Sequence, residues 1–183
     1  MFRAFLSRQI DKMERQFSYD ASYIRQMLRV SPVSFLKFGL VSQLMDRKAA
    51  PGELLAAAGI AATLVEDCGP CTQIGVDIAT AGGVDPMILK GILAGDLAAM
   101  GDVAALGWRF AHASMARDME AADPLRDEIV ARWGEKGLLA VSLAITTSRM
   151  YPTLKYAMGY GKACSRVTVA GEPTPVAHIA LAA

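Results

Sequence analysis

Two cysteines at a spacing of three, in the segment Cys68-Gly69-Pro70-Cys71, are the residues of this sequence best suited to chemistry. If the segment opens a helix, this spacing places both sulfur atoms on one face, close enough for a disulfide. Pro70 fits such a position because the first helical turn tolerates proline, whose missing N–H would be unpaired there anyway. The pattern therefore predicts a dithiol that can be oxidised and reduced.

The position of Cys68 at or beside a helix start favours its ionised form. The free N–H groups and the positive end of the helix dipole stabilise a thiolate there. Glu66 and Asp67 act in the opposite direction, because nearby negative charge raises the pKa of a thiol. We expect Cys68 to be an exposed thiol whose pKa is moderately lowered.

Two other interpretations of the cysteine pair remain open. The pair could be half of a zinc site, for which Cys164, His112 and His178 are the other soft donors in the sequence, or it could be an inert pair in the core. No second cysteine pair completes a zinc site, and a Gly-Pro dipeptide after two acidic residues is unusual between core cysteines. We therefore expect no metal and no cofactor, with Cys164 serving as a small buried apolar residue.

The segments that must position these cysteines are predicted to be helices. Alanine and methionine are frequent while aromatic residues make up 7% of the chain, a composition that favours helix over strand. We expect an all-α protein with helices over residues 2–17, 32–45, 54–65, 72–80, 86–100, 102–122, 125–133, 135–150 and 152–160. The one plausible strand, 165–170, has no obvious partner.

Two of these predicted helices have informative faces. Residues 54–65 contain so few polar side chains that we expect a buried central helix. Apolar residues of 2–17 recur at spacings of three and four, which gives the stripe of an amphipathic helix. That stripe could lie on a membrane surface or pack on the body or a neighbouring subunit, and the acidic residues on its polar face favour packing.

Charge divides the chain into two parts and excludes several classes of protein. Residues 1–50 hold nine Lys or Arg against four Asp or Glu, whereas residues 51–183 hold ten against fourteen. The net charge of +1 gives no electrostatic reason to bind nucleic acid. No apolar run is long enough for a transmembrane segment, no export signal is recognisable, and three cysteines cannot form a secreted disulfide framework. We expect a cytoplasmic protein.

The order of these features resembles the alkylhydroperoxidase D-like, or carboxymuconolactone decarboxylase, superfamily. The resemblance covers residues 53–100: a helix with an early glutamate, Glu53, then a short turn, the CxxC that opens a second helix, and Asp85-Pro86 before a third. It implies a multi-helix orthogonal bundle of the alkylhydroperoxidase D-like type, assembled as a homotrimer or homohexamer. It also implies a dithiol in which Cys71 takes the peroxide and Cys68, the more exposed cysteine, resolves it as a disulfide.

The sequence departs from the family motif at its proton relay. The family has histidines just before the second cysteine and four residues after it, where this chain has Pro70 and Gly75. The position of the family's relay glutamate is Ala56, three residues after Glu53. Glu53 is therefore the candidate for a catalytic carboxylate, and Glu66 and His112 are the other residues that could replace the missing relay.

These observations divide the chain into three parts and predict one activity. A basic N-terminal helical segment, 1–50, packs on an alkylhydroperoxidase D-like helical core, 51–165, and an irregular tail follows at 166–183. The predicted function is a thiol–disulfide oxidoreductase with peroxidase-like, antioxidant activity, which takes a peroxide or disulfide substrate and electrons from a thiol donor protein. The alternative is a non-enzymatic redox-sensing or assembly protein on the same scaffold. Lactone decarboxylation fits less well, because that branch of the superfamily does not use such a dithiol.

Mild oxidation should join Cys68 to Cys71, since their spacing on a helix start brings the two sulfur atoms together. Peptide mapping by mass spectrometry should find this disulfide in the oxidised protein and lose it on reduction. The Cys164→Ser variant should form the same bond. A bond between Cys164 and either member of the pair would contradict the prediction.

Overall fold

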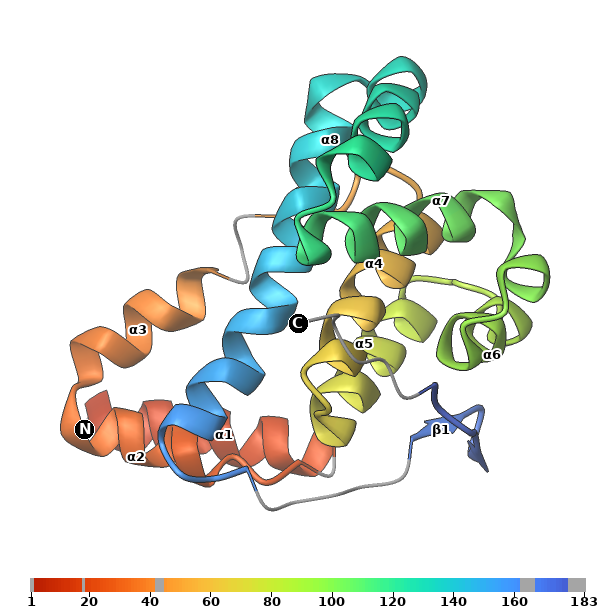
Figure 1. The fold of residues 1–183 in the computed structure, drawn as a ribbon. Coiled ribbons are helices and arrows are strands. Elements are labelled where there is room, and N and C mark those ends of the chain that lie inside the picture. Colours follow the sequence, from red (N-terminus) through yellow and green to blue (C-terminus); the bar gives the residue numbers. More distant parts are fainter. Residues whose placement is uncertain (1, 18, 42–44, 162–166, 178–183) are drawn as a thin grey trace.

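Helices make up most of the chain in a computed structural model that describes residues 2–17, 19–41, 45–161 and 167–177 (Figure 1). The all-α prediction is confirmed at this level. The helices are α1 (Phe2–Phe17), α2 (Ser22–Val30), α3 (Pro32–Val41), α4 (Gly52–Val65), α5 (Gly69–Ala81), α6 (Pro86–Ala94), α7 (Leu97–Ala116) and α8 (Met119–Ala157).

Helix α4 is the centre of the main core. It carries few polar side chains, and the residues from Leu54 to Leu64 are buried apart from Ala56 and Gly59, which are half-buried. Helices α5, α6, α7 and α8 all pack against it (Figure 1). The prediction of a buried central helix over 54–65 is confirmed. A helix that is apolar on most faces is stabilised by burial on most sides, because burial removes its apolar side chains from water.

The breaks expected at residues 101 and 134 fall at two glycines, but α6 ends earlier than expected, at Ala94, and α8 begins earlier than expected, at Met119. Gly101 and Gly134 have positive φ angles of 75° and 68°, a backbone conformation that favours glycine, and each marks a kink inside α7 or α8. The helix starts at Asp96 and Asp118 carry side-chain caps that accept backbone N–H groups. Because these aspartates begin α7 and α8, Pro124 lies inside α8 and does not start a helix of its own.

The N-terminal helices form a second, smaller apolar cluster. Leu6 and Ile10 of α1 are buried with Tyr19, Tyr23 and Leu28. The apolar stripe of α1 therefore packs on the rest of the chain, the arrangement that its acidic residues favoured. Helix α2 was not expected, and α3 ends at Val41 within the described residues.

Helix α2 is held to α1 by a charged cluster. The guanidinium of Arg25 lies 2.7 Å from a carboxylate oxygen of Asp11 and also pairs with Glu14. The Arg25 guanidinium holds the pKa of the Glu14 carboxyl below its usual range. Neither carboxylate lies near Arg25 in the sequence, so the local pattern of residues 22–30 could not reveal this contact.

The tail contains a short hairpin. Thr168–Val169 (β1) pairs antiparallel with Glu172–Pro173 (β2), and Val169 is buried. The expected strand therefore has a partner after all, three residues further along the chain. Gln73 of α5 fixes the hairpin, because its side-chain oxygen accepts the backbone N–H of Thr168 at 2.6 Å. No helix in the described part of the chain is both long and apolar enough to cross a bilayer.

Gly107→Ala should destabilise the protein, since a Cβ at this position of α7 would lie 2.4 Å from the backbone oxygen of Leu54 in α4. The loss in the free energy of unfolding should be about 1–3 kcal/mol or more, as for other overpacked cores, measured by chemical denaturation. The matched variant is Gly39→Ala in α3, where a Cβ meets nothing within 4 Å. That variant should be neutral or slightly stabilising. Equal effects from both variants would contradict the close approach of α4 and α7.

Candidate functional site

Cys68 and Cys71 lie together at the start of α5. Cys68 is the N-cap residue, Pro70 occupies the first turn, and the amide of Thr72 donates to the Cys68 carbonyl at 2.9 Å. The thiol of Cys71 hydrogen-bonds the sulfur of Cys68, and the Cys71 backbone N–H also points to it. This is the arrangement that the CxxC spacing predicts.

The hydrogen bond between the two thiols separates their acidities. The Cys71 thiol, followed by the Cys71 backbone N–H and the charge of Lys155, lowers the pKa of Cys68 to about 7 against the opposing effect of burial. The same hydrogen bond, together with burial, raises the pKa of Cys71. The pair therefore gains a single negative charge as the pH rises through about 7, and this charge is centred on Cys68 and stabilised by the Cys71 proton.

The exposure of the pair differs from the expectation. Cys68 is 3% exposed and Cys71 7%, so Cys68 is not the more accessible thiol. The reason is that α8 covers the turn between α4 and α5. The Tyr156 hydroxyl donates to the backbone oxygen of Asp67 at 2.8 Å, immediately before Cys68.

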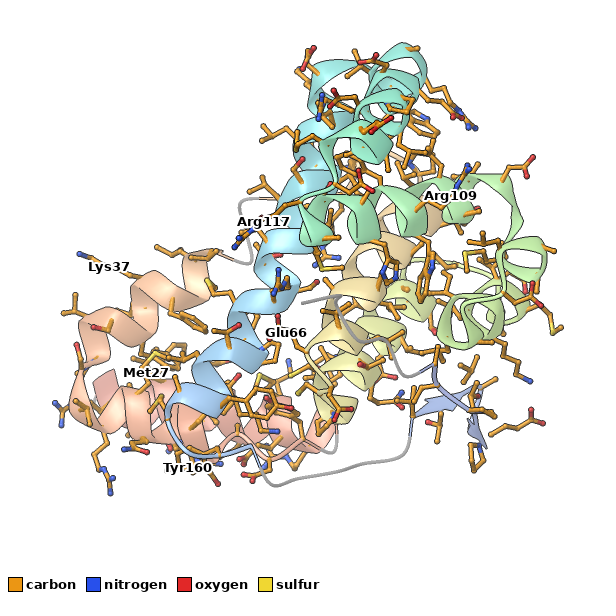
Figure 2. The ribbon with its side chains drawn as sticks, in the orientation of Figure 1. Met27, Lys37, Glu66, Arg109, Arg117 and Tyr160 are labelled. Carbon is orange, nitrogen blue, oxygen red and sulfur yellow. The ribbon has the colours of Figure 1, made fainter. Side chains whose placement is uncertain are left out.

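Glu66 also ties this turn to α8. The guanidinium of Arg149 lies 2.6 Å from its carboxylate, and the hydroxyl of Thr153 lies 3.5 Å away. Figure 2 shows Glu66, the residue that ends α4, beside the blue part of α8. Because its carboxylate is paired with a guanidinium, Glu66 stabilises the turn and is a poor candidate for the missing proton relay.

Lys155 is the functional residue that sequence analysis missed. It is 3% exposed although it carries an ammonium group, and its charge lowers the pKa of both cysteines. Its nitrogen lies 5.7 Å from the ring centroid of Tyr19, within the range of a cation–π interaction. A buried cation is costly unless an anion or a polarised group lies close to it. The Cys68 thiolate and the carboxylate of Asp20 are the groups beside it that can supply that anion, since the charge of Lys155 favours the ionised form of both.

Two buried tyrosines complete the polar surroundings of the cysteines. The hydroxyl of Tyr19 donates to that of Tyr23 at 3.3 Å, and the nearby Tyr19 hydroxyl acts to lower the pKa of Cys71 against the larger effects that raise it. Burial raises the pKa of both phenols, so both remain neutral donors at neutral pH. The spacing of these residues from the CxxC motif, roughly fifty positions, leaves no local signal by which sequence could have found them.

Cys71 opens onto an apolar cavity of about 430 Å³. One face of α4, one face of α5 and part of α8 form its walls, and the N-terminal helices close it at the Cys71 end. The apolar side chains that line it include Phe17, Leu55, Ile74, Ile78 and Val84. Cys68 does not line the cavity, so a molecule inside it meets Cys71 first.

The structure does not bring the other candidates to the pair. Glu53 stands in the first turn of α4 whereas Cys68 follows its last turn, and the 14 residues of this helix rise by about 20 Å. His112 stacks on Trp108, with ring centroids 4.7 Å apart, and lines a separate depression. Burial lowers the pKa of His112. Cys164 and His178 lie outside the described residues.

Metal-ligating side chains do not gather within the described ranges: no group of three or more His, Cys, Asp or Glu there could hold a metal ion. A zinc site on Cys68 and Cys71 would therefore need ligands from the segments around Cys164 and His178.

Comparisons of the chain with models of protein families, with curated protein sequences and with solved structures find no match. The candidate site therefore rests on the geometry described above, and the superfamily resemblance rests on the motif residues alone.

Lys155→Met should raise the pKa of Cys68 above its value of about 7, because the variant removes a positive charge that favours the thiolate. A higher pKa leaves less thiolate at pH 7, so modification by an alkylating reagent should slow several-fold. Thiolate absorbance against pH, with the far-ultraviolet spectrum as a check of folding, measures the shift. The control is Lys136→Met on the exposed surface of α8, which should leave the titration unchanged. An unchanged titration in Lys155→Met would show that this ammonium does not act on the pair.

Proposed function

We propose that the protein is a thiol–disulfide oxidoreductase whose dithiol is Cys68 and Cys71. The observation that carries the proposal is the hydrogen-bonded pair itself: a thiol with a pKa of about 7 next to a second thiol that lines a cavity. A peroxide or a disulfide of a partner molecule is the substrate class, and a thiol donor restores the dithiol. The superfamily resemblance supports the same chemistry.

In the proposed peroxide reaction Cys71 is the attacking residue, because it is the cysteine that faces the cavity. Its sulfur attacks one peroxide oxygen, the O–O bond breaks, and the leaving oxygen departs as an alcohol or water after protonation. Cys71 becomes a sulfenic acid. The Cys68 sulfur then attacks the Cys71 sulfur, the S–S bond forms and water leaves, so that two thiols and one peroxide give one disulfide, one alcohol and one water.

The site supports proton transfer without the family's histidines. The Cys68 thiolate accepts the hydrogen bond of the Cys71 thiol, so it is placed to take that proton as Cys71 attacks. Tyr19 stabilises the charge that develops on Cys71 when its hydroxyl turns from Tyr23 to donate to that sulfur. Lys155 provides the compensating positive charge. The relay proposed here therefore consists of Cys68, Tyr19 and Lys155, with no role for Glu53.

The second candidate function is redox sensing without turnover, on the same scaffold. The low exposure of both cysteines favours it, because a disulfide enclosed by α8 and the N-terminal helices is poorly accessible to a large reductant. Formation of that disulfide would remove the thiolate beside Lys155 and alter the turn at Asp67, and both changes would affect the contacts of α8. Turnover with a reductant separates the two functions.

The purified protein should reduce an organic hydroperoxide or a small disulfide repeatedly when a small dithiol is the reductant. Substrate consumption and oxidation of the reductant should proceed in a one-to-one ratio. Cys68→Ser and Cys71→Ser should each fall to the uncatalysed background, because each removes one half of the disulfide. Cys164→Ser should retain the activity.

One reduction per protein molecule, followed by no further turnover with the small dithiol, would instead support the sensing function. Full activity in either single serine variant of the pair would contradict both functions.

A further inference from the structure

The cavity beside Cys71 is a channel with one closed and one open end. At the closed end lie Tyr19, Tyr23, Thr63 and Cys71, all less than 9% exposed. At the other end lie Arg47, Gly52 and Gly82, all exposed. A ligand can therefore enter beside Arg47 and reach Cys71 only with its innermost end.

The length of the channel follows from the two helices that form its walls. Lining residues recur along one face of α5 from Cys71 to Gly82, and along one face of α4 from Gly52 to Thr63. Each of these intervals of eleven residues corresponds to about 16 Å of helix. One acyl chain of a lipid spans half of a bilayer core of about 30 Å, so the channel has the length of such a chain.

The chemistry of the walls also fits an unbranched chain. Small residues such as Gly59, Gly75 and Ala79 leave space along the axis, while Ile74, Ile78 and Leu55 supply apolar contact. A cavity of about 430 Å³ lies within the roughly 300–1,000 Å³ range of ligand pockets. The walls hold no carboxylate among the described lining residues.

Arg47 defines the polar end of the ligand. It is the one charged side chain among the described residues that line the channel. It is exposed, and within the described part of the chain it forms no ion pair. A guanidinium matches the two oxygens of a carboxylate, which it can bind with two parallel hydrogen bonds.

We propose that this channel binds an unbranched fatty-acyl carboxylate, with the carboxylate at Arg47 and the end of the chain at Cys71. Binding of this ligand does not depend on the redox chemistry of the cysteines. Where the oxidoreductase function also holds, the channel would select substrates whose reactive group lies at the far end of an acyl chain.

Dodecanoate, used below its micelle-forming concentration, is the probe for this site. It should bind the full-length protein saturably in calorimetry, and it should bind the Cys68→Ser variant equally well, because Cys68 does not line the channel. This variant separates the proposal from the oxidoreductase function, since the disulfide between Cys68 and Cys71 cannot form in it. Dodecanoate should also protect Cys71 of the wild-type protein from a small alkylating reagent.

Two changes test the polar end. Arg47→Ala should weaken dodecanoate binding about tenfold, and methyl dodecanoate, which lacks the charge, should bind the wild-type protein about tenfold more weakly than dodecanoate. The matched control is Lys48→Ala, because Lys48 is an exposed neighbouring cation that does not line the channel. Equal losses in the two alanine variants would overturn the role of Arg47.

Gly75→Val tests the depth of the channel. Gly75 lines the channel about 10 Å along α5 from the open end, and a Cβ there would lie 3.3 Å from the side chain of Ile60, which leaves no room for the valine methyl groups except toward the channel. The valine should therefore weaken dodecanoate binding at least tenfold while octanoate, a shorter chain, keeps its wild-type affinity. Equal effects on both chain lengths, or the absence of saturable dodecanoate binding to the wild-type protein, would overturn the proposal.

Discussion

Helix α4 has apolar side chains on nearly every face, with Glu53 and Thr63 as the polar exceptions. Exposure of any of its faces to water is therefore unfavourable. Burying such a helix requires neighbours on all sides, because the gain in free energy scales with the apolar area removed from water. Helices α5, α6, α7 and α8 supply these neighbours. Where α7 crosses α4, Gly107 allows the two backbones to touch. This requirement fixes where the following turn, with its two cysteines, can lie.

The cysteine turn lies between the two apolar clusters of the molecule. One cluster surrounds α4, and the other joins the N-terminal helices to the end of α8. Burial at this junction removes water from Cys68 and Cys71, and electrostatic interactions are therefore stronger there than at the surface. The Cys71 thiol and the buried ammonium of Lys155 therefore act strongly on the negative charge of Cys68. The N-terminal segment thus contributes directly to the site, as well as packing on the body.

Three glycines that line the channel lie in close contact with neighbouring elements. A Cβ would lie 3.3 Å from Ile60 at Gly75, 3.3 Å from Val84 at Gly52 and 3.0 Å from Ser148 of α8 at Gly59. Larger residues at these positions would displace the side chains that line the channel. The helices that carry the dithiol therefore also form the path that leads to it.

Much of the fold and part of the site could be predicted from residue types and spacing. Helical periodicity, the apolar run of residues 54–65 and the CxxC motif at a helix start are local properties, because each depends on neighbours within a few positions of the chain. They correctly indicated the helical class, the central helix and the paired thiols. Helix α2 was missed because its stability comes from Arg25 bound to α1 and from Tyr23 buried among other elements. The end of α6 was misplaced because Gly95, whose positive φ ends this helix, looks like any other glycine in the sequence.

The sequence by itself determined which residues could carry redox chemistry, whereas the tertiary structure decided what surrounds them. Glu53 was a reasonable candidate by spacing, yet the length of α4 separates it from the pair. Lys155 and Tyr19 lie far from the cysteines in the chain and have no motif, and only the packing of α8 and the N-terminal helices brings them together. The same packing buried Cys68, which a helix start alone would have left accessible. The physical reason is that thiol spacing is set by the local helix, while thiol acidity and access are set by burial and by charges from distant segments.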